Sequence, residues 1–140
     1  MKRIGGVSDS HGDRAHLGKA LYRLEAEGPL DAFIHCGDGC REGMLLSRDI
    51  PQVACVKGNC DGWNDAPEEG LLIQVGGVPI YITHGHRYHV KDDLEALACA
   101  AEGKGARVAC YGHTHARSAQ YLHGILLLNP GACAWTGDCA

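Results

Sequence analysis

Short apolar runs alternate with longer amphipathic stretches along this chain, and the apolar runs end in glycines or polar residues. Short runs rich in β-branched residues predict strands, and apolar positions at helical spacing predict helices. We expect strands over residues 2–8, 30–36, 52–56, 70–75, 78–83, 106–111, 119–124 and 125–128, and helices over residues 14–27, 40–48 and 90–102. Strands that alternate with helices indicate an α/β protein in which at least one sheet has parallel neighbours.

Acidic residues mark the starts of two predicted helices. Asp13 is placed to cap the helix over residues 14–27, because an aspartate before the first turn can accept a free backbone N–H. Asp92 and Asp93 are expected in the first turn of the helix over residues 90–102, where negative charge favours the positive end of the helix dipole.

Length and composition indicate one globular domain over residues 1–140, with 45% hydrophobic residues. No apolar run approaches the roughly 20 residues of a membrane span, and the first residues lack the apolar core of a signal peptide. We therefore expect a cytoplasmic protein without a membrane partner. The formal net charge of −4 argues against a nonspecific nucleic-acid binder, so we expect no nucleic acid duplex as a partner.

The eight cysteines lie at positions 36, 40, 55, 60, 99, 110, 133 and 139, and none forms a Cys-x-x-Cys pair. The core spacing of zinc ribbons and thioredoxin-like redox sites is therefore missing. Cys36, Cys55 and Cys110 fall inside apolar runs, where cysteine acts as a small buried hydrophobe. Because no secretory signal is present, we interpret the cysteines as reduced thiols.

A paired histidine motif, His113-Thr114-His115, follows the predicted strand over residues 106–111. Residues two apart in a strand point to the same side, so a strand end that continues into a loop could aim both imidazoles at one point. Two converging neutral imidazoles suit a divalent metal ion. Alone, such a motif is more often a surface loop, and it gains weight only if other strand ends supply ligands.

Other strand ends do carry such residues, namely Asp9, His11, Asp38, Asn59 and His84. In α/β folds, binding sites form outside the carboxyl ends of the strands. With the histidine pair these residues offer seven oxygen or nitrogen ligands, whereas one zinc ion takes about three or four. Each could separately be a capping aspartate, a turn asparagine or a core histidine, but their shared position favours two metal ions. His35, inside its predicted strand, is interpreted instead as a packed strand residue.

The strand-end residues lie in five ordered motifs: Asp9-Ser10-His11, Gly37-Asp38, Gly58-Asn59-Cys60-Asp61, His84-Gly85-His86 and Gly112-His113-Thr114-His115. With Asn129-Pro130-Gly131, their order and spacing resemble the calcineurin-like metallophosphoesterases, and among them the YfcE-type phosphodiesterase branch. The resemblance runs from Lys2 to about Ala132. It implies a four-layer α/β/β/α sandwich of two mixed sheets, with the C-terminal part shortened after the Asn-Pro-Gly turn.

The resemblance also implies a two-metal centre. Asp9, His11 and His115 would hold one ion, Asn59, His84 and His113 would hold the other, and Asp38 would bridge them. Family members use manganese, iron, zinc, nickel or cobalt, and we expect manganese. Two divalent ions, two aspartates and a bridging hydroxide would leave a net charge of about +1, which can hold a phosphate within an acidic protein. The implied function is hydrolysis of phosphate esters, diesters in particular, by that hydroxide.

One position departs from the pattern of many superfamily members. They have a general-acid histidine directly after the motif asparagine, whereas this chain has Cys60, as the YfcE-type branch also does. A thiol is a poor proton donor to a leaving group near neutral pH. We therefore expect either a preference for good leaving groups or the use of His86 as the acid. Asp61 either orients a neighbouring group or caps the turn, and it completes the candidate catalytic set of Asn59, Cys60, Asp61 and His86.

The expected substrate is a small phosphate ester, with Arg41 and Arg87 as phosphate contacts or as solvated side chains. An edge strand left open near the C-terminus favours a homo-oligomer. Two alternatives stay open. One is a non-catalytic scaffold that works through protein contacts, like the retromer's metallophosphoesterase-like subunit, and the complete ligand set counts against it. The other is a structural zinc site built from cysteines, and the missing Cys-x-x-Cys spacing counts against that.

Overall fold

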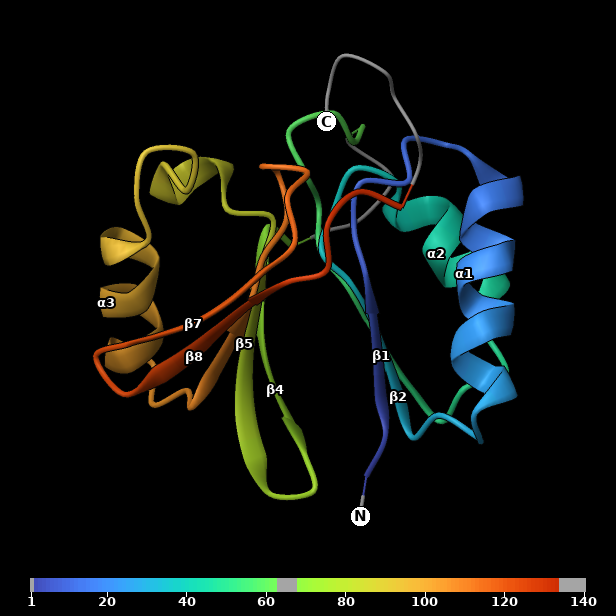
Figure 1. Ribbon diagram of the computed structural model, residues 1–140, viewed down its shortest axis with the longest axis horizontal. Helices are drawn as coiled ribbons and strands as arrows, with labels where there is room; N and C mark the ends of the chain where they lie inside the picture. Colours follow the sequence, from blue (N-terminus) through green and yellow to red (C-terminus); the bar gives the residue numbers. More distant parts are fainter. Residues whose placement is uncertain (1, 63–67, 134–140) are drawn as a thin grey trace.

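Two β-sheets form the frame of the protein, and the computed structural model describes them over residues 2–62 and 68–133 (Figure 1). The first sheet has the order β1-β2-β3, with β1 (Ile4–Val7), β2 (Ala32–His35) and β3 (Gln52–Cys55). The second has the order β4-β5-β6-β8-β7, with β4 (Gly70–Val75), β5 (Val78–Thr83), β6 (Val108–Cys110), β7 (Ser118–Leu122) and β8 (Ile125–Asn129). Strands β5, β6 and β8 are parallel, whereas β4 and β7 are antiparallel to their neighbours.

Helices cover the outer face of each sheet, which gives four layers (Figure 1). α1 (Arg14–Ala26) and α2 (Cys40–Leu46) lie on the three-stranded sheet, and α3 (Glu95–Gly103) lies on the five-stranded sheet. The predicted α/β/β/α sandwich is confirmed. The five-stranded sheet is mixed as predicted, but the described strands of the other sheet are all parallel. They are parallel because α1 and α2 return the chain to the same edge before each new strand.

Alternation along the strands divides the core into separate packed layers. In β2, Ile34 packs between the sheets with Ile82 of β5, while its neighbour Phe33 packs against Leu17 of α1. The outer face of the five-stranded sheet packs around Leu97 of α3. Burying each such side chain contributes about 1.5–3 kcal/mol, so these layers hold the strand ends firmly in place.

The start of α3 differs from the helix predicted over residues 90–102. The helix begins at Glu95, and residues 89–92 before it form a turn that is closed by a hydrogen bond from Asp92 N to His89 O (2.9 Å). Asp92 and Asp93 therefore precede the helix and are not part of its first turn. Asp93 still supports the helix start, since its Oδ1 accepts the backbone N–H of Glu95 at 3.0 Å.

The remaining predictions for the fold concern membrane spans, the cysteines and two segments without regular structure. No helix in the described ranges is both long enough and apolar enough to cross a membrane. The cysteines within those ranges, from Cys36 to Cys133, form no disulfide with one another. The predicted shortening of the C-terminal part falls on residues 134–140, and much of the predicted loop over residues 62–70 falls on residues 63–67. Both segments lie outside the described residues.

Candidate metal centre

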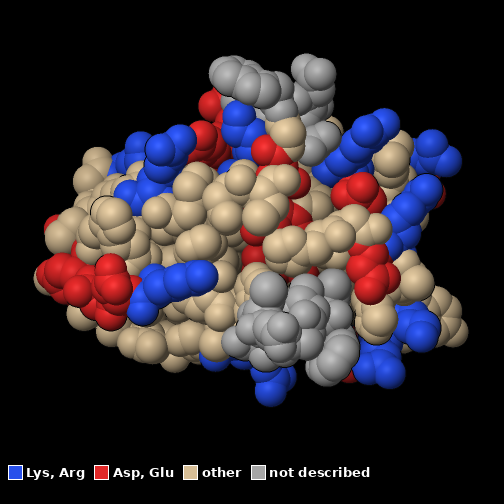
Figure 2. Space-filling model, turned by 90° about the horizontal axis from the view of Figure 1, so that it is seen from above, with Lys and Arg blue, Asp and Glu red and all other residues tan. Residues whose placement is uncertain are grey.

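The loops after the parallel strands of both sheets meet at one end of the molecule (Figure 1). The loops after β1 and β2 are joined by a hydrogen bond from Asp9 N to Gly37 O (2.9 Å), and those after β5 and β6 by one from Gly112 N to His84 O (3.0 Å). Seen from that end, acidic side chains are visible along the middle of the face, while lysines and arginines lie mainly towards its edges (Figure 2). This end of the molecule therefore has a negative centre suited to cations.

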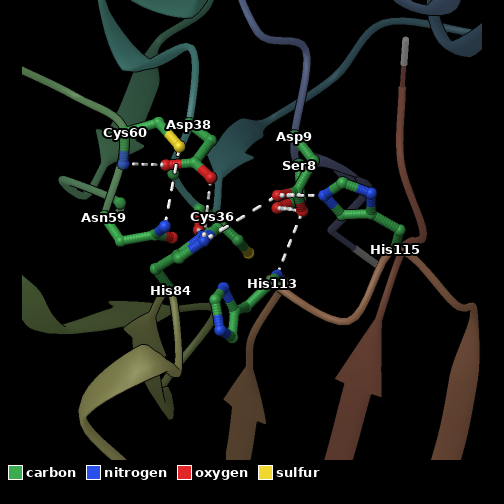
Figure 3. A network of polar contacts seen from close by, with 12 residues as sticks. Ser8, Asp9, Cys36, Asp38, Asn59, Cys60, His84, His113 and His115 are labelled. Atoms are coloured by element: carbon green, nitrogen blue, oxygen red, sulfur yellow. Dashed lines mark hydrogen bonds and ion pairs between the residues drawn. The ribbon is translucent and has the colours of Figure 1, made fainter. Parts of the chain in front are cut away.

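Asp9 is fully buried, and its two carboxylate oxygens have different surroundings (Figure 3). Oδ2 accepts the hydroxyl of Ser8 (2.6 Å) and the backbone N–H of His113 (3.1 Å). Oδ1 accepts no hydrogen bond within the described structure, and it lies 3.2 Å from Nε2 of His115 and 3.8 Å from Nε2 of His84. A buried carboxylate oxygen without a donor is costly, so Oδ1 is oriented for a different kind of partner.

Asp38 approaches the same point from the loop after β2. Its Oδ1 accepts the backbone N–H of Cys60 (2.8 Å), and its Oδ2 lies 3.2 Å from Nε2 of His84 and 3.9 Å from Nε2 of His11. Burial raises the pKa of Asp38, but the hydrogen bond and charge of His84 and the Cys60 N–H together lower it to about 2. Asp38 is therefore an anion at neutral pH, with one oxygen fixed and the other facing the histidines.

The ring of His84 is buried between the two aspartates. Its Nδ1 lies 2.7 Å from the carbonyl oxygen of Cys36, and because a carbonyl only accepts, Nδ1 carries a proton and donates it. Nε2 is left facing Asp9 Oδ1 and Asp38 Oδ2. Burial lowers the pKa of His84, but the hydrogen bond and charge of Asp38, with the charge of Asp9, outweigh it and raise the pKa. A positive charge at this point is favoured, whether a proton or a metal ion supplies it.

Two more histidines complete the cluster on the Asp9 side. Nε2 of His11 lies 3.4 Å from Nε2 of His115 and 3.7 Å from Oδ1 of Asp9. The ligand atoms of Asp9, His11 and His115 all lie within 4.8 Å of one another, and the same holds for Asp9, Asp38 and His84. The first group matches the set predicted for one ion. The second joins Asp9 to Asp38, the predicted bridge, and to His84, which was predicted to act at the other ion.

The structure places His113 and Asn59 beside the second group. The ring centroid of His113 lies 5.0 Å from that of His84. Burial, followed by the charge of His84, lowers the pKa of His113 to about 4, so its imidazole is neutral at neutral pH. The amide of Asn59 lies on the Asp38 side of His84 (Figure 3), where its Nδ2 donates to Sγ of Cys60 at 3.5 Å.

These residues fit divalent metal ions by their own chemistry. The buried Oδ1 of Asp9 has no hydrogen-bond partner in the described structure and faces Nε2 of His84. Carboxylate oxygens and imidazole nitrogens are the donor types that zinc, manganese, iron and nickel accept. The partners on the far side of each group, such as Cys36 O behind His84, orient the ligands as they do in metal sites.

A model of the calcineurin-like phosphoesterase superfamily domain matches residues 1–139. The chain belongs to this family. It is 40% identical over 126 residues to the probable metallophosphoesterase YsnB of Bacillus subtilis, covering 90% of this chain and 72% of that protein. It is 28% identical to the phosphodiesterase MJ0936 of Methanocaldococcus jannaschii, covering 94% and 84%. A solved Vps29 variant of Entamoeba histolytica is similar with a TM-score of 0.79 and 27% identity, covering 96% and 77%.

Two predicted catalytic residues of this phosphoesterase lie at the rim of the cluster. Cys60 is exposed, and burial together with the charge of Asp38 raises the pKa of its thiol, so it is protonated at neutral pH. The ring centroid of His86 lies 5.6 Å from that of His84, and its Nε2 lies 3.8 Å from Oε2 of Glu69. Burial, with the charge of His84, lowers the pKa of His86. Both side chains therefore border the cluster.

The carboxylate of Asp61 in this phosphoesterase is bound by backbone N–H groups. It accepts the N–H groups of Asp38 and Gly39 (2.9 Å each) and of Gly58 (2.8 Å). These bonds tie the loop after β2 to the loop after β3. Asp61 therefore positions Asp38, which agrees with an orienting role and also with the capping role left open by the sequence.

The two arginines predicted as possible phosphate contacts, Arg41 and Arg87, have different surroundings. Arg87 donates from Nε (2.8 Å) and Nη2 (3.2 Å) to the carboxylate of Glu69, so its guanidinium is engaged beside His86. Arg41 is exposed at the start of α2. No sequence pattern indicated Glu69, because its partner Arg87 lies on the loop after a different strand.

A buried histidine links two of the metal-site loops. Nδ1 of His35 accepts the N–H of Gly37 (3.1 Å), so Nε2 carries the proton and donates to Oγ of Ser10 (2.9 Å). Burial lowers the pKa of His35 to about 4, which keeps it neutral. His35 is packed in its strand as predicted, and it also positions Ser10, next to Asp9. Sequence reasoning missed Ser8 and Ser10; a usable signal was their position on either side of a strand-end aspartate.

Asn129 holds the loop that carries His113 and His115. Its Nδ2 donates to Gly112 O (3.2 Å) and to Oγ1 of Thr114 (2.9 Å).

We expect Asn129→Asp to lower the free energy of unfolding by about 1–3 kcal/mol, because a carboxylate replaces the donor and faces a buried carbonyl. Metal affinity should fall about 10- to 100-fold, as for other residues that orient ligands. Urea denaturation and metal titration measure both, with the exposed amide change Gln120→Glu as the control. If Asn129→Asp bound metal with unchanged affinity, Asn129 would not be needed to hold the loop of His113 and His115 in place.

Gly58 leaves the space that Asp38 occupies. A Cβ at Gly58 would overlap Oδ1 of Asp38 and lie 2.5 Å from its backbone nitrogen. We expect Gly58→Ala to lower the free energy of unfolding by about 1–3 kcal/mol and to displace the carboxylate, with loss of metal binding. Gly18→Ala in α1 is the control, since no atom lies within 4 Å of its Cβ. That substitution should stabilise the helix by about 0.5–1 kcal/mol. Equal effects of the two changes would show that Gly58 has no special role.

Proposed function

We propose that this protein is a metal-dependent phosphodiesterase with a two-metal centre. Its proposed ligands are Asp9, His11, Asp38, Asn59, His84, His113 and His115. The observation that carries the proposal is the pair of buried aspartates whose inward oxygens face Nε2 of His84. Membership of the calcineurin-like phosphoesterases supports phosphate-ester hydrolysis, and a relative named as a phosphodiesterase supports diester specificity.

The ligands divide between two positions in this proposal. Asp9, His11 and His115 would hold one ion, Asn59, His84 and His113 the other, with Asp38 between them. Bound ions would supply Lewis acidity towards the phosphoryl oxygens and an activated water as nucleophile. We propose manganese as the preferred ion, with nickel, cobalt, zinc or iron as substitutes for the same oxygen and nitrogen donors.

The chain's own residues keep these ligands in one arrangement. Ser8 and the His113 N–H fix Asp9, and the Cys60 N–H fixes Asp38, so only one oxygen of each aspartate faces inward. The rim offers a thiol at Cys60 and an imidazole at His86, and the raised pKa of the thiol makes Cys60 a weak proton donor. We therefore propose small phosphodiesters with good leaving groups as substrates, in the cytoplasm, without membrane or duplex partners.

Two features concern protein partners. β1 is an edge strand of its sheet in the described structure, and we propose that association through such an edge gives a homo-oligomer. The similarity to a Vps29 structure favours a second candidate function, a scaffold of the same fold that acts through protein contacts. The fixed inward carboxylates count against the scaffold, because protein contacts alone do not require them.

The test is hydrolysis of bis-p-nitrophenyl phosphate by metal-stripped protein to which manganese, nickel, cobalt, zinc or magnesium is added back. We expect no turnover without metal and the highest turnover with manganese. Absence of turnover with every ion, from protein that circular dichroism shows to be folded, would contradict the enzyme and favour the scaffold. Turnover only on monoesters would keep the phosphoesterase and reject the diester preference.

A further inference from the structure

A second group of ligand-type side chains lies on the outer side of the five-stranded half, where α3 covers the sheet (Figure 1). Glu95 and Cys99 are four residues apart on α3, so they share one face of the helix. His123 reaches the same face from the turn between β7 and β8. The ligand atoms of the three residues all lie within 4.8 Å of one another. None of them belongs to the strand-end cluster.

The hairpin turn fixes the position of His123. β7 and β8 remain paired up to Leu122 and Ile125, which leaves only His123 and Gly124 in the turn. Both have positive φ, 54° and 75°, as the commonest two-residue hairpin turn requires. The imidazole therefore extends from a short, defined turn, and its Nε2 lies 2.5 Å from Oε1 of Glu95.

We propose that Glu95, Cys99 and His123 bind one zinc ion, with the fourth coordination position open to water. Zinc bonds of about 2.0–2.3 Å in tetrahedral geometry place neighbouring ligand atoms roughly 3–4 Å apart. Sγ of Cys99 lies 4.0 Å from Oε1 of Glu95, so small side-chain rotations reach this geometry without movement of the backbone. The backbone therefore positions three residues of the types that bind zinc close enough together to coordinate one ion.

The charges of the group also suit a zinc ion. Cys99 would bind as the thiolate, and its proton would pass to solvent. One thiolate and the carboxylate of Glu95 balance the two positive charges of the ion, while His123 binds as the neutral ring. All three residues are exposed, so little desolvation opposes binding. The ion would tie the β7–β8 hairpin to α3, and this role does not depend on the proposed catalysis.

Cobalt(II) titration of the full chain tests the site, because a cobalt–thiolate bond gives a near-ultraviolet charge-transfer band that carboxylates and imidazoles do not. We expect the band in the wild type and in Cys60→Ser, and no band in Cys99→Ser. His123→Ala should weaken cobalt binding at least about tenfold. His16→Ala is the matched control, because His16 also lies 2.6 Å from an acid, Asp13, but belongs to no three-ligand group among the described residues.

The Cys60→Ser variant is needed because Cys60 forms a candidate group with His11 and Asp38. A band that survives in Cys99→Ser, or that disappears in Cys60→Ser, would assign the thiolate to the strand-end cluster and overturn the proposal. A wild type without any band would overturn it as well. Zinc content by mass spectrometry should fall by one ion per chain in Cys99→Ser. Because the substituted side chains are exposed, circular dichroism should show an unchanged fold.

Discussion

Asp38→Asn is expected to lower kcat towards bis-p-nitrophenyl phosphate by about 10³-fold and to reduce the bound metal. Substituting residues that merely orient a metal ligand costs about 10- to 100-fold, and Asp38 is itself the proposed shared ligand. Its Oδ2 lies 3.2 Å from Nε2 of His84, and the substitution removes the negative charge that favours a cation there. Steady-state kinetics with added manganese and metal analysis of the dialysed protein measure the two effects.

Asp49→Asn is the matched control for this loss. Asp49 is exposed on the segment before β3, so the same loss of charge should leave kcat and metal content unchanged. The Asp38→Asn protein should remain folded, because asparagine has nearly the same shape as aspartate and the Cys60 N–H can still reach its amide oxygen. If Asp38→Asn retained both metal ions and most of its activity, Asp38 would not be the shared ligand.

Cys60→His is expected to raise the hydrolysis rate of diesters with poor leaving groups by about 100-fold. A positioned imidazolium contributes roughly 10²–10⁴-fold as a general acid near neutral pH, where a thiol contributes little. Cys60 is exposed, so a larger side chain has room. The contact that matters to Asp38 comes from the backbone N–H of residue 60, which the substitution retains. The gain should be small for p-nitrophenyl esters, whose leaving group needs no proton.

The dependence of log kcat/KM on leaving-group pKa measures this effect. The wild type should show a steep decline with rising leaving-group pKa, and Cys60→His a flatter one. Cys60→Ser is the control and should keep the steep decline, because a hydroxyl is no better an acid than the thiol. A flat dependence in the wild type would contradict the preference for good leaving groups. If that dependence became steep in His86→Gln, His86 would be the acid.

The structure brings strand-end residues such as Asp9, Asp38 and His115 together, but the strand alternation that was expected to align them is absent. Asp9 and His11, like His113 and His115, were expected to face one side because alternate residues of a strand do. In the structure β1 ends at Val7, and these residues lie in loops with positive φ of 54°, 47°, 70° and 62°. Left-handed conformations are costly for such residues, and they cluster at functional sites. The rule that sites form at strand ends identified the residues, whereas the loop backbone sets their directions.

Local signals fixed some elements and not others. Asp13 caps α1 as predicted, since its carboxylate accepts the N–H of His16. The later start of α3 reflects the turn over residues 89–92, which no local pattern indicated. The role of His35 could not be predicted either, because its partners become visible only when β1 lies beside β2. Contacts between segments far apart in the chain are the part that sequence patterns leave open.

The most direct test of the two-metal centre is a crystal structure of the manganese-loaded protein with anomalous diffraction recorded at the manganese edge. We expect two peaks about 3.5–4 Å apart, one beside Asp9, His11 and His115 and one beside Asn59, His84 and His113, with the Asp38 carboxylate contacting both. A single peak between Asp9, Asp38 and His84, or no peak among these residues, would contradict the account.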